Sequence, residues 1–168
     1  PDVYRVLSAM EDVGSTRRGF FIAGLGAAQF ALPGAVDRLR GTEKCPGLLL
    51  ASCDPANPFG AALPWPATQG HRPARKAGSL VVLDDGYPVI YLERGAHTLI
   101  TFAQASPDQL DRALSQLAAA VDTGHLGAVT IRRVNAAPAL QELQLGVALE
   151  RAGFVMVPQG YRRRRTRE

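Results

Sequence analysis

The chain has 168 residues, of which 46% are hydrophobic and 20% are charged. This is ordinary globular composition, and the length suffices for one domain or two small ones, so a wholly disordered chain is excluded. The sequence has no run of eighteen apolar residues and no basic N-terminal segment followed by an apolar stretch. We therefore expect a soluble, cytoplasmic protein with no membrane partner.

The helix expected first begins at the chain's N-terminus. The chain opens on Pro1 and enters an amphipathic pattern at once, so we expect it to start in mid-protein. This helix ends at Gly14, residues 15–22 and 29–32 read as strands, and the glycine-rich residues 23–28 form the turn between them. Helix, strand, turn and strand make up the second half of a winged helix, which we assign to residues 1–40.

Two arginines, Arg17 and Arg18, would lie on the wing hairpin. They are candidates for phosphate contacts, because the hairpin of a winged helix touches the DNA backbone. The alternative is that they are merely solvated strand residues.

A short helix over 35–40 and a polar linker over 41–46 lead to the second domain, residues 47–168. Four runs rich in Leu, Val, Ile, Thr and aromatic residues follow, at 47–53, 79–83, 89–93 and 97–102. They predict a small antiparallel β-sheet or barrel. Asp85-Gly86, between two of the runs, indicates a hairpin because Gly tolerates the positive φ of a tight turn.

Residues 54–78 form a long loop that contains five prolines and Trp65. Long loops without regular structure are often functional, and proline stiffens them. The basic residues Arg72, Arg75 and Lys76, with His71, near its end are therefore candidate DNA contacts. The alternatives are that Trp65 is a core plug and that the charges are only solvated.

The last third of the chain predicts two helices and two strands. Ser106, Pro107 and Gln109 mark the start of a helix that Gly124 ends. A strand over 128–134, a helix over 138–152 and a strand over 154–157 follow. The fold class is thus α+β, with two helices covering one sheet face and leaving the other face or the long loop for a partner.

The positive charge is concentrated at the C-terminus. Residues 1–161 contain 14 basic and 14 acidic side chains, whereas residues 162–168 contain five arginines and one glutamate, so the excess of +4 lies in this tail. We expect a flexible or edge-strand arm that binds the DNA backbone without reading sequence. The arm's candidate contacts are Arg162, Arg163, Arg164, Arg165 and Arg167. A solubilising end that binds nothing is the alternative.

Neither a metal nor a small-molecule cofactor is indicated for this chain. Cys45 and Cys53 are eight residues apart with no histidine at ligand spacing, so we expect two reduced thiols and no zinc. A P-loop needs a lysine after its second glycine, which Gly24-Leu25-Gly26 lacks. We therefore expect no ATPase activity from this chain.

Four segments resemble the C-terminal region of the bacterial large helicase-related (Lhr) family of ATP-dependent DNA helicases. They are residues 18–40 (RGFFIAGLGAAQFALPGAVDRLR), 54–66 (DPANPFGAALPWP), 72–78 (RPARKAG) and 145–154 (LGVALERAGF), and together they span nearly the whole chain. The resemblance implies a parent hydrolase that binds ATP and Mg²⁺ outside this fragment and unwinds DNA in repair. It also implies two partners, DNA and the helicase core of the same parent chain.

Three functions are therefore open for the fragment. The first is a DNA-binding or accessory module of the helicase. The second is DNA glycosylase chemistry, because longer members of the family resemble glycosylases that use a Gln-x-Asp pair, and Gln109-Leu110-Asp111 matches those letters. Helix capping is the simpler account of that string. The third is self-association into a homo-oligomer through an exposed sheet face.

Overall fold

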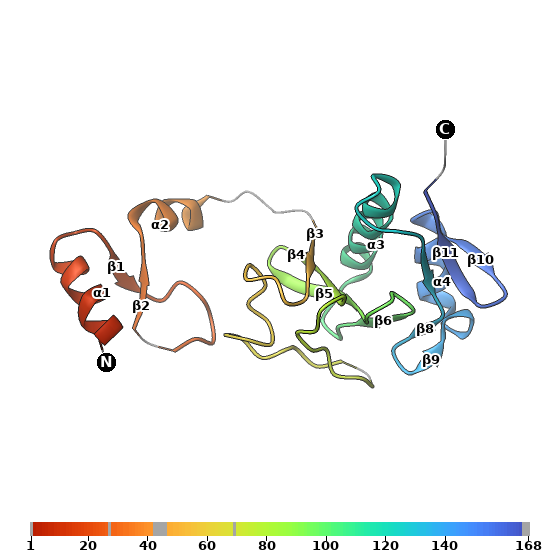
Figure 1. Ribbon diagram of the computed structural model, residues 1–168, viewed down its shortest axis with the longest axis horizontal. Helices are drawn as coiled ribbons and strands as arrows, with labels where there is room; N and C mark the ends of the chain where they lie inside the picture. The colour runs from red at the N-terminus through yellow and green to blue at the C-terminus, as the bar shows by residue number, and fades with distance from the viewer. Residues whose placement is uncertain (1, 27, 42–46, 69, 166–168) are drawn as a thin grey trace. The chain divides into compact units, whose positions relative to one another are not determined.

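The computed structural model describes residues 2–26, 28–41, 47–68 and 70–165. The chain divides into two compact units, Pro1–Lys44 and Cys45–Glu168 (Figure 1). Of the linker expected at 41–46, only Gly41 lies within the described residues. Among the described residues, no helix is both long and apolar enough to cross a membrane.

The first unit has the predicted order of helix, hairpin and helix. Helix α1 (Asp2–Asp12) is followed by strands β1 (Arg17–Gly19) and β2 (Gln29–Ala31), which pair antiparallel, and by helix α2 (Pro33–Arg40) (Figure 1). Gly14, at φ +75°, ends the first helix in a left-handed conformation that glycine adopts more easily than other residues do. The second half of a winged helix is therefore present.

Both hairpin strands are shorter than the sequence predicts. The side-chain oxygen of Gln29 accepts hydrogen bonds from the backbone N–H groups of Phe21 and Ile22. Its amide nitrogen donates to the carbonyls of Ile22 and Gly26. Because the Gln29 side chain already satisfies these backbone groups, they do not have to pair across the hairpin. The β1–β2 ladder therefore ends at Gly19.

The second unit is built on a six-stranded sheet in the order β3-β4-β5-β6-β8-β9. Its strands are β3 (Leu48–Ala51), β4 (Leu80–Asp84), β5 (Tyr87–Leu92), β6 (Thr98–Thr101), β8 (Arg133–Val134) and β9 (Ala137–Pro138). The first four pair antiparallel as predicted, whereas β6 and β8 run parallel. Among the described strands the sheet is open, with β3 and β9 at its edges, so the barrel alternative is wrong.

The predicted hairpin at Asp85-Gly86 joins β4 to β5. Both residues have positive φ, 49° and 81°, which is the pattern of a two-residue type I′ turn. Asp84 faces Tyr87 directly across the turn. The register shifts between Val82 and Leu83, opposite Pro88, which has no N–H to donate to the ladder.

A second, three-stranded sheet has the order β10-β11-β7 and corrects two predictions. It contains β7 (Val129–Ile131), β10 (Val155–Val157) and β11 (Gly160–Arg163). The single strand predicted over 128–134 is two strands in two sheets, because the N–H groups of Arg132 and Arg133 both bind the His97 carbonyl where the chain changes sheets. The arginine tail, expected as an arm or edge strand, starts as the middle strand of this sheet.

Helix α3 (Pro107–Asp122) begins as predicted. Ser106 and Gln109 form a complete capping box, in which each side chain binds the other residue's backbone N–H. The helix predicted over 138–152 is shorter: a 3-10 turn η1 (Ala139–Gln141) precedes helix α4 (Leu143–Arg151). Glu142, at ψ 75°, separates them because it leaves the helical region.

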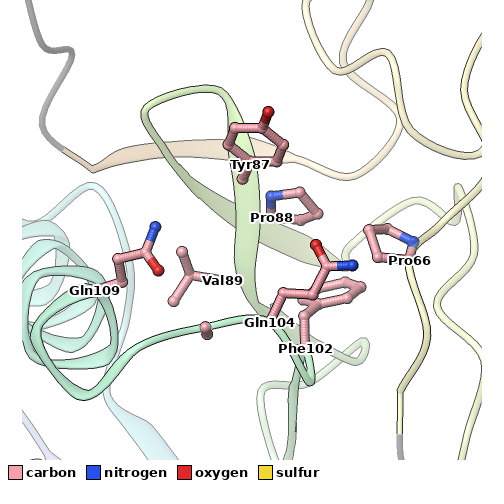
Figure 2. Close-up of a pocket in the computed structure, with 8 residues that line it drawn as sticks. Pro66, Tyr87, Pro88, Val89, Phe102, Gln104 and Gln109 are labelled. Atoms are coloured by element: carbon pink, nitrogen blue, oxygen red, sulfur yellow. The ribbon is translucent and has the colours of Figure 1, made fainter. Parts of the chain in front are cut away.

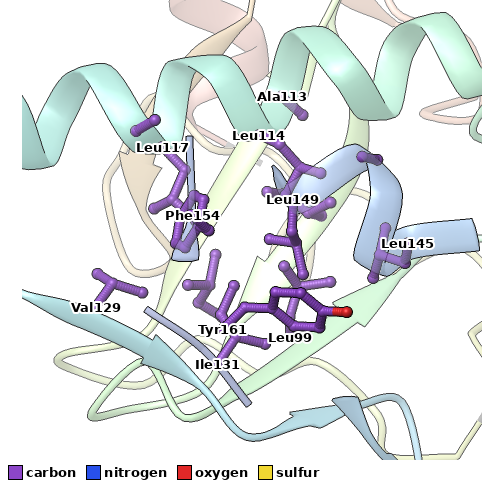
Figure 3. Close-up of a cluster of buried hydrophobic side chains, with 14 of the residues drawn as sticks. Leu99, Ala113, Leu114, Leu117, Val129, Ile131, Leu145, Leu149, Phe154 and Tyr161 are labelled. Atoms are coloured by element: carbon purple, nitrogen blue, oxygen red, sulfur yellow. The ribbon is translucent and has the colours of Figure 1, made fainter. Parts of the chain in front are cut away.

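Both faces of the six-stranded sheet are covered. One face packs against α3 and α4 through the core that Figure 3 shows, with Leu99, Leu114 and Leu149 fully buried. The opposite face, which the sequence left open for a partner, is covered by the long loop through Phe59 and Trp65. Trp65 stacks between Phe59 and Phe102. The prolines of this loop thus stiffen the segment that covers this face of the sheet.

Candidate nucleic-acid interface

The two wing arginines lie in different surroundings. Arg17 is exposed, and no side-chain partner of it is found within the described part of the chain. Arg18 instead contacts α1, where its Nη2 lies 2.7 Å from Oε2 of Glu11 and 3.2 Å from Oγ of Ser8. Its guanidinium carbon lies 5.1 Å from the ring centroid of Phe30. Arg18 therefore joins the hairpin to the helix. The donors of Arg17, by contrast, remain available to an external ligand.

The basic residues of the long loop also divide. Arg75 donates from Nη1 to the carbonyls of Asn57 (2.5 Å) and Phe59, and from Nη2 to those of Cys53 and Asp54. A guanidinium has five N–H groups, so most of this donor capacity is spent on the loop itself.

Arg72 and Lys76 are exposed. No hydrogen bond or ion pair of either side chain is found in residues 2–26, 28–41, 47–68 and 70–165. These two side chains therefore keep the full donor capacity that Arg75 has lost.

Of the C-terminal arginines, Arg163 is bound to the fold, whereas its neighbours in the described part of the chain face solvent. Arg163 makes a two-pronged contact with Asp122, at 2.9 and 2.5 Å, and donates to the Gly153 carbonyl. The hydrogen bond from Arg163 lowers the pKa of Asp122. Arg162, Arg164 and Arg165 are exposed and have no side-chain partner among the described residues, and Arg167 lies outside them.

These differences separate nine of the ten candidate side chains, those within the described part of the chain, into two groups. Three are held by internal contacts, namely Arg18, Arg75 and Arg163. Six face solvent without a side-chain partner there, namely Arg17, Arg72, Lys76, Arg162, Arg164 and Arg165. Composition alone could not separate them, because the acids and carbonyls that hold Arg75 and Arg163 lie 10 to 41 residues away in the chain.

The Gln109-Leu110-Asp111 string does not form one site. Gln109 caps α3, whereas the carboxylate of Asp111 lies 2.7 Å from Nη2 of Arg151. Residues two apart on a helix point away from each other. Accordingly, the two side chains line different pockets, Gln109 that of Figure 2 and Asp111 another beside Asn135 and Glu142. They cannot hold one water between them.

A pocket that the sequence did not reveal lies at the start of β5 (Figure 2). It has a volume of about 190 Å³. Its lining residues come from the long loop, the β4–β5 hairpin, the segment after β6 and the first turn of α3: Pro66, Tyr87, Pro88, Val89, Phe102, Gln104, Ala105 and Gln109. The only signal in the sequence was Tyr87, an aromatic residue directly after the hairpin turn.

An ion pair between buried Asp84 and half-exposed Arg112 fixes the hairpin beside this pocket. The Asp84 side chain, only 2% exposed, accepts hydrogen bonds from Nε and Nη2 of Arg112 on α3 at 3.1 and 2.7 Å. These bonds are the largest cause that holds the pKa of Asp84 below its ordinary value. Because Asp84 directly precedes the turn, the pair clamps the hairpin to α3, and the pocket between them keeps its shape.

Comparison with known proteins finds relatives in one family. The protein-family model described as the winged-helix domain of the large helicase-related protein matches residues 1–48. The Lhr helicase/probable uracil glycosylase of Mycolicibacterium smegmatis is 40% identical over 96% of the chain, and the Lhr helicase/uracil glycosylase of Escherichia coli is 33% identical over 95%. The chain spans only 12% and 11% of these two relatives.

Proposed function

The chain belongs to the large helicase-related (Lhr) family, as a C-terminal accessory part of such a helicase, and on that premise we propose that it binds DNA. The contacts are made by the basic side chains that face solvent on the wing, on the long loop, and on and after β11. DNA unwinding, ATP and Mg²⁺ binding, and a role in DNA repair in the cytoplasm belong, in this proposal, to the parent helicase.

The distribution of free donors is the observation that carries the proposal. Six basic side chains face solvent without side-chain partners among the described residues, namely Arg17, Arg72, Lys76, Arg162, Arg164 and Arg165. An arginine fork donates two hydrogen bonds to one phosphate and stays charged at any physiological pH. Because the rest of the chain is balanced in charge, these local sites rather than a general positive field would hold the backbone.

The salt dependence of duplex binding tests the proposal. The double variant Arg164→Gln/Arg165→Gln removes two free donors, and Arg38→Gln/Arg133→Gln removes the same charge from side chains that are already hydrogen-bonded. If both tail arginines touch phosphates, the first variant flattens the slope of log affinity against log salt by about 1.8 on duplex DNA. The second variant leaves the slope unchanged.

Equal slopes for the wild type and both variants would remove the tail from the interface. Arg17→Gln and Arg72→Gln then test the wing and the loop in the same assay. If no variant changes the slope, the chain does not hold DNA through these side chains.

Uracil excision is the second function that we propose, because both relatives carry uracil glycosylase in their names. The pocket lined by Asp111, Asn135 and Glu142 supplies two carboxylates that could act on a flipped base, whereas the Asn135 amide is already hydrogen-bonded to Thr101. A uracil-containing oligonucleotide incubated with the chain would then break at the uracil on alkaline treatment, and Asp111→Asn would abolish the breaks. An intact strand leaves DNA binding as the function of the chain.

A further inference from the structure

We infer that the pocket in front of Tyr87 binds one unpaired nucleobase, and that the adjoining groove with Arg72 takes the phosphates beside it. The inference rests on the proposed DNA binding and adds the form of nucleic acid that this unit takes, a single strand. Neither the winged-helix match nor the names of the relatives assigns a ligand to these residues.

The size of the pocket selects a small ring. Its volume of about 190 Å³ is below the roughly 300–1,000 Å³ of ordinary small-molecule sites, so a cofactor or nucleotide would not fit whole. Figure 2 shows the pocket between the start of β5, the segment that carries Phe102 and Gln104, and Pro66 of the long loop. Its walls are mostly apolar, as the face of a base requires.

Tyr87 supplies the stacking surface. Its side chain is 64% exposed, although the rest of β5 is buried. An aromatic ring left in water beside an apolar hollow offers its face to a planar partner. The backbone that carries the ring is preorganised, because the type I′ turn and the Asp84–Arg112 clamp hold the hairpin in place.

Gln104 supplies the polar edge. Its side chain is exposed, and no hydrogen bond of its amide is found within the described residues. Gln109, the other amide of the lining, uses its oxygen to cap α3. A free amide both donates and accepts, as does the Watson–Crick edge of a base, and that edge is available only when the base is unpaired.

The adjoining groove supplies the charge. It has a volume of about 570 Å³, shares Pro66 with the pocket, and is lined by Trp65, Arg72 and Pro73 among others. Neither lining contains an acidic residue. A phosphate next to the bound base would therefore meet Arg72 without repulsion, and aromatic faces beside a basic groove are the usual means of holding single strands.

Titration with oligo(dT) tests the inference, and Trp65 is its reporter. It is the single tryptophan of the chain and lines the groove, so a strand bound there changes its emission. Tyr87→Ala weakens binding of the oligonucleotide by about 5- to 150-fold, the effect of losing one base–aromatic stack. Tyr87→Phe keeps the ring and stays within about twofold of the wild type. Met156→Ala, a control at another exposed apolar residue on the other sheet, leaves the affinity unchanged.

A strand of the same length and charge without bases separates stacking from attraction to phosphate. We expect this abasic strand to bind the wild type as weakly as oligo(dT) binds Tyr87→Ala. Equal affinity for both strands, or an unchanged affinity in Tyr87→Ala, overturns the inference. A proline-rich peptide that changes Trp65 emission through Tyr87, where oligo(dT) does not, would assign the groove to a peptide and overturn it as well.

Failure of this inference is distinct from failure of the proposed DNA binding. Duplex affinity and its dependence on Arg164 and Arg165 do not involve Tyr87. If duplex binding persists while Tyr87→Ala has no effect, only the base site is lost. If no nucleic acid binds, both proposals fall together.

Discussion

In the unit over Cys45–Glu168, long apolar side chains such as Ile90, Leu114 and Leu149 have no exposed surface, whereas α1 and α2 of the unit over Pro1–Lys44 bury no residue. The first unit instead leaves Val3 and Phe20 more than 70% exposed. Burial of apolar area is the dominant favourable contribution to folding. The comparison therefore indicates that the second unit has a core of its own, while the first is held by contacts near its surface.

The largest test of this difference is Leu114→Ala. Leu114 lies on α3 in the middle of the core (Figure 3), with no exposed surface. Truncation leaves a cavity, so we expect the free energy of unfolding of the second unit to fall by about 2–5 kcal/mol in urea denaturation. Ser115→Ala, next to it on the exposed side of the helix, is the control and changes it by less than about 0.5 kcal/mol. A loss below about 1 kcal/mol for Leu114→Ala would contradict a tightly packed core.

The next largest effect is expected for Gly146→Ala in α4. A Cβ at this buried position would overlap the hydroxyl of Tyr161 on β11. Alanine gains up to about 1 kcal/mol of helix propensity, but overpacking costs about 1–3 kcal/mol, so we expect a net loss of about 1–2 kcal/mol in the same denaturation assay.

Tyr161→Phe checks the cause of that loss. It removes the hydroxyl that the new methyl group would meet, so the Gly146→Ala change should cost less in the Tyr161→Phe background than in the wild type. Additive effects of the two substitutions would show that α4 and β11 are not in close contact at this point.

Local signals in the sequence predicted much of this fold. The hairpin at Asp85-Gly86 and the capping box at Ser106 need only neighbouring residues, and both are present. Predictions failed where a partner far along the chain decides the outcome. The strand over 128–134 divides because its two halves find different sheets, and Arg162 and Arg163 form a central strand because β7 and β10 lie on either side.

The candidate site followed the same rule. The types and positions of the basic residues could be read from the sequence, but which of them face solvent depends on Asp122 for Arg163 and on four loop carbonyls for Arg75. The pocket at Tyr87 could not be predicted, since its walls come from four segments that only the fold brings together.

The smallest expected effect belongs to the first unit and to Arg18→Ala. Arg18 joins the hairpin to α1 through Glu11 and lies over the rings of Tyr4 and Phe30. Its side chain is 42% exposed, so the ion pair contributes at most about 1 kcal/mol and the cation–π contacts about as much. We expect a loss of about 1 kcal/mol confined to this unit, seen as roughly fivefold faster hydrogen exchange of the α1 and β2 amides and unchanged exchange in the second unit.

Arg17→Ala is the matched control for Arg18→Ala: it should leave exchange unchanged, because the Arg17 side chain has no partner in the described part of the chain. If Arg18→Ala instead cost as much as Leu114→Ala, the first unit would have a core after all, and the contrast between the two units would not hold.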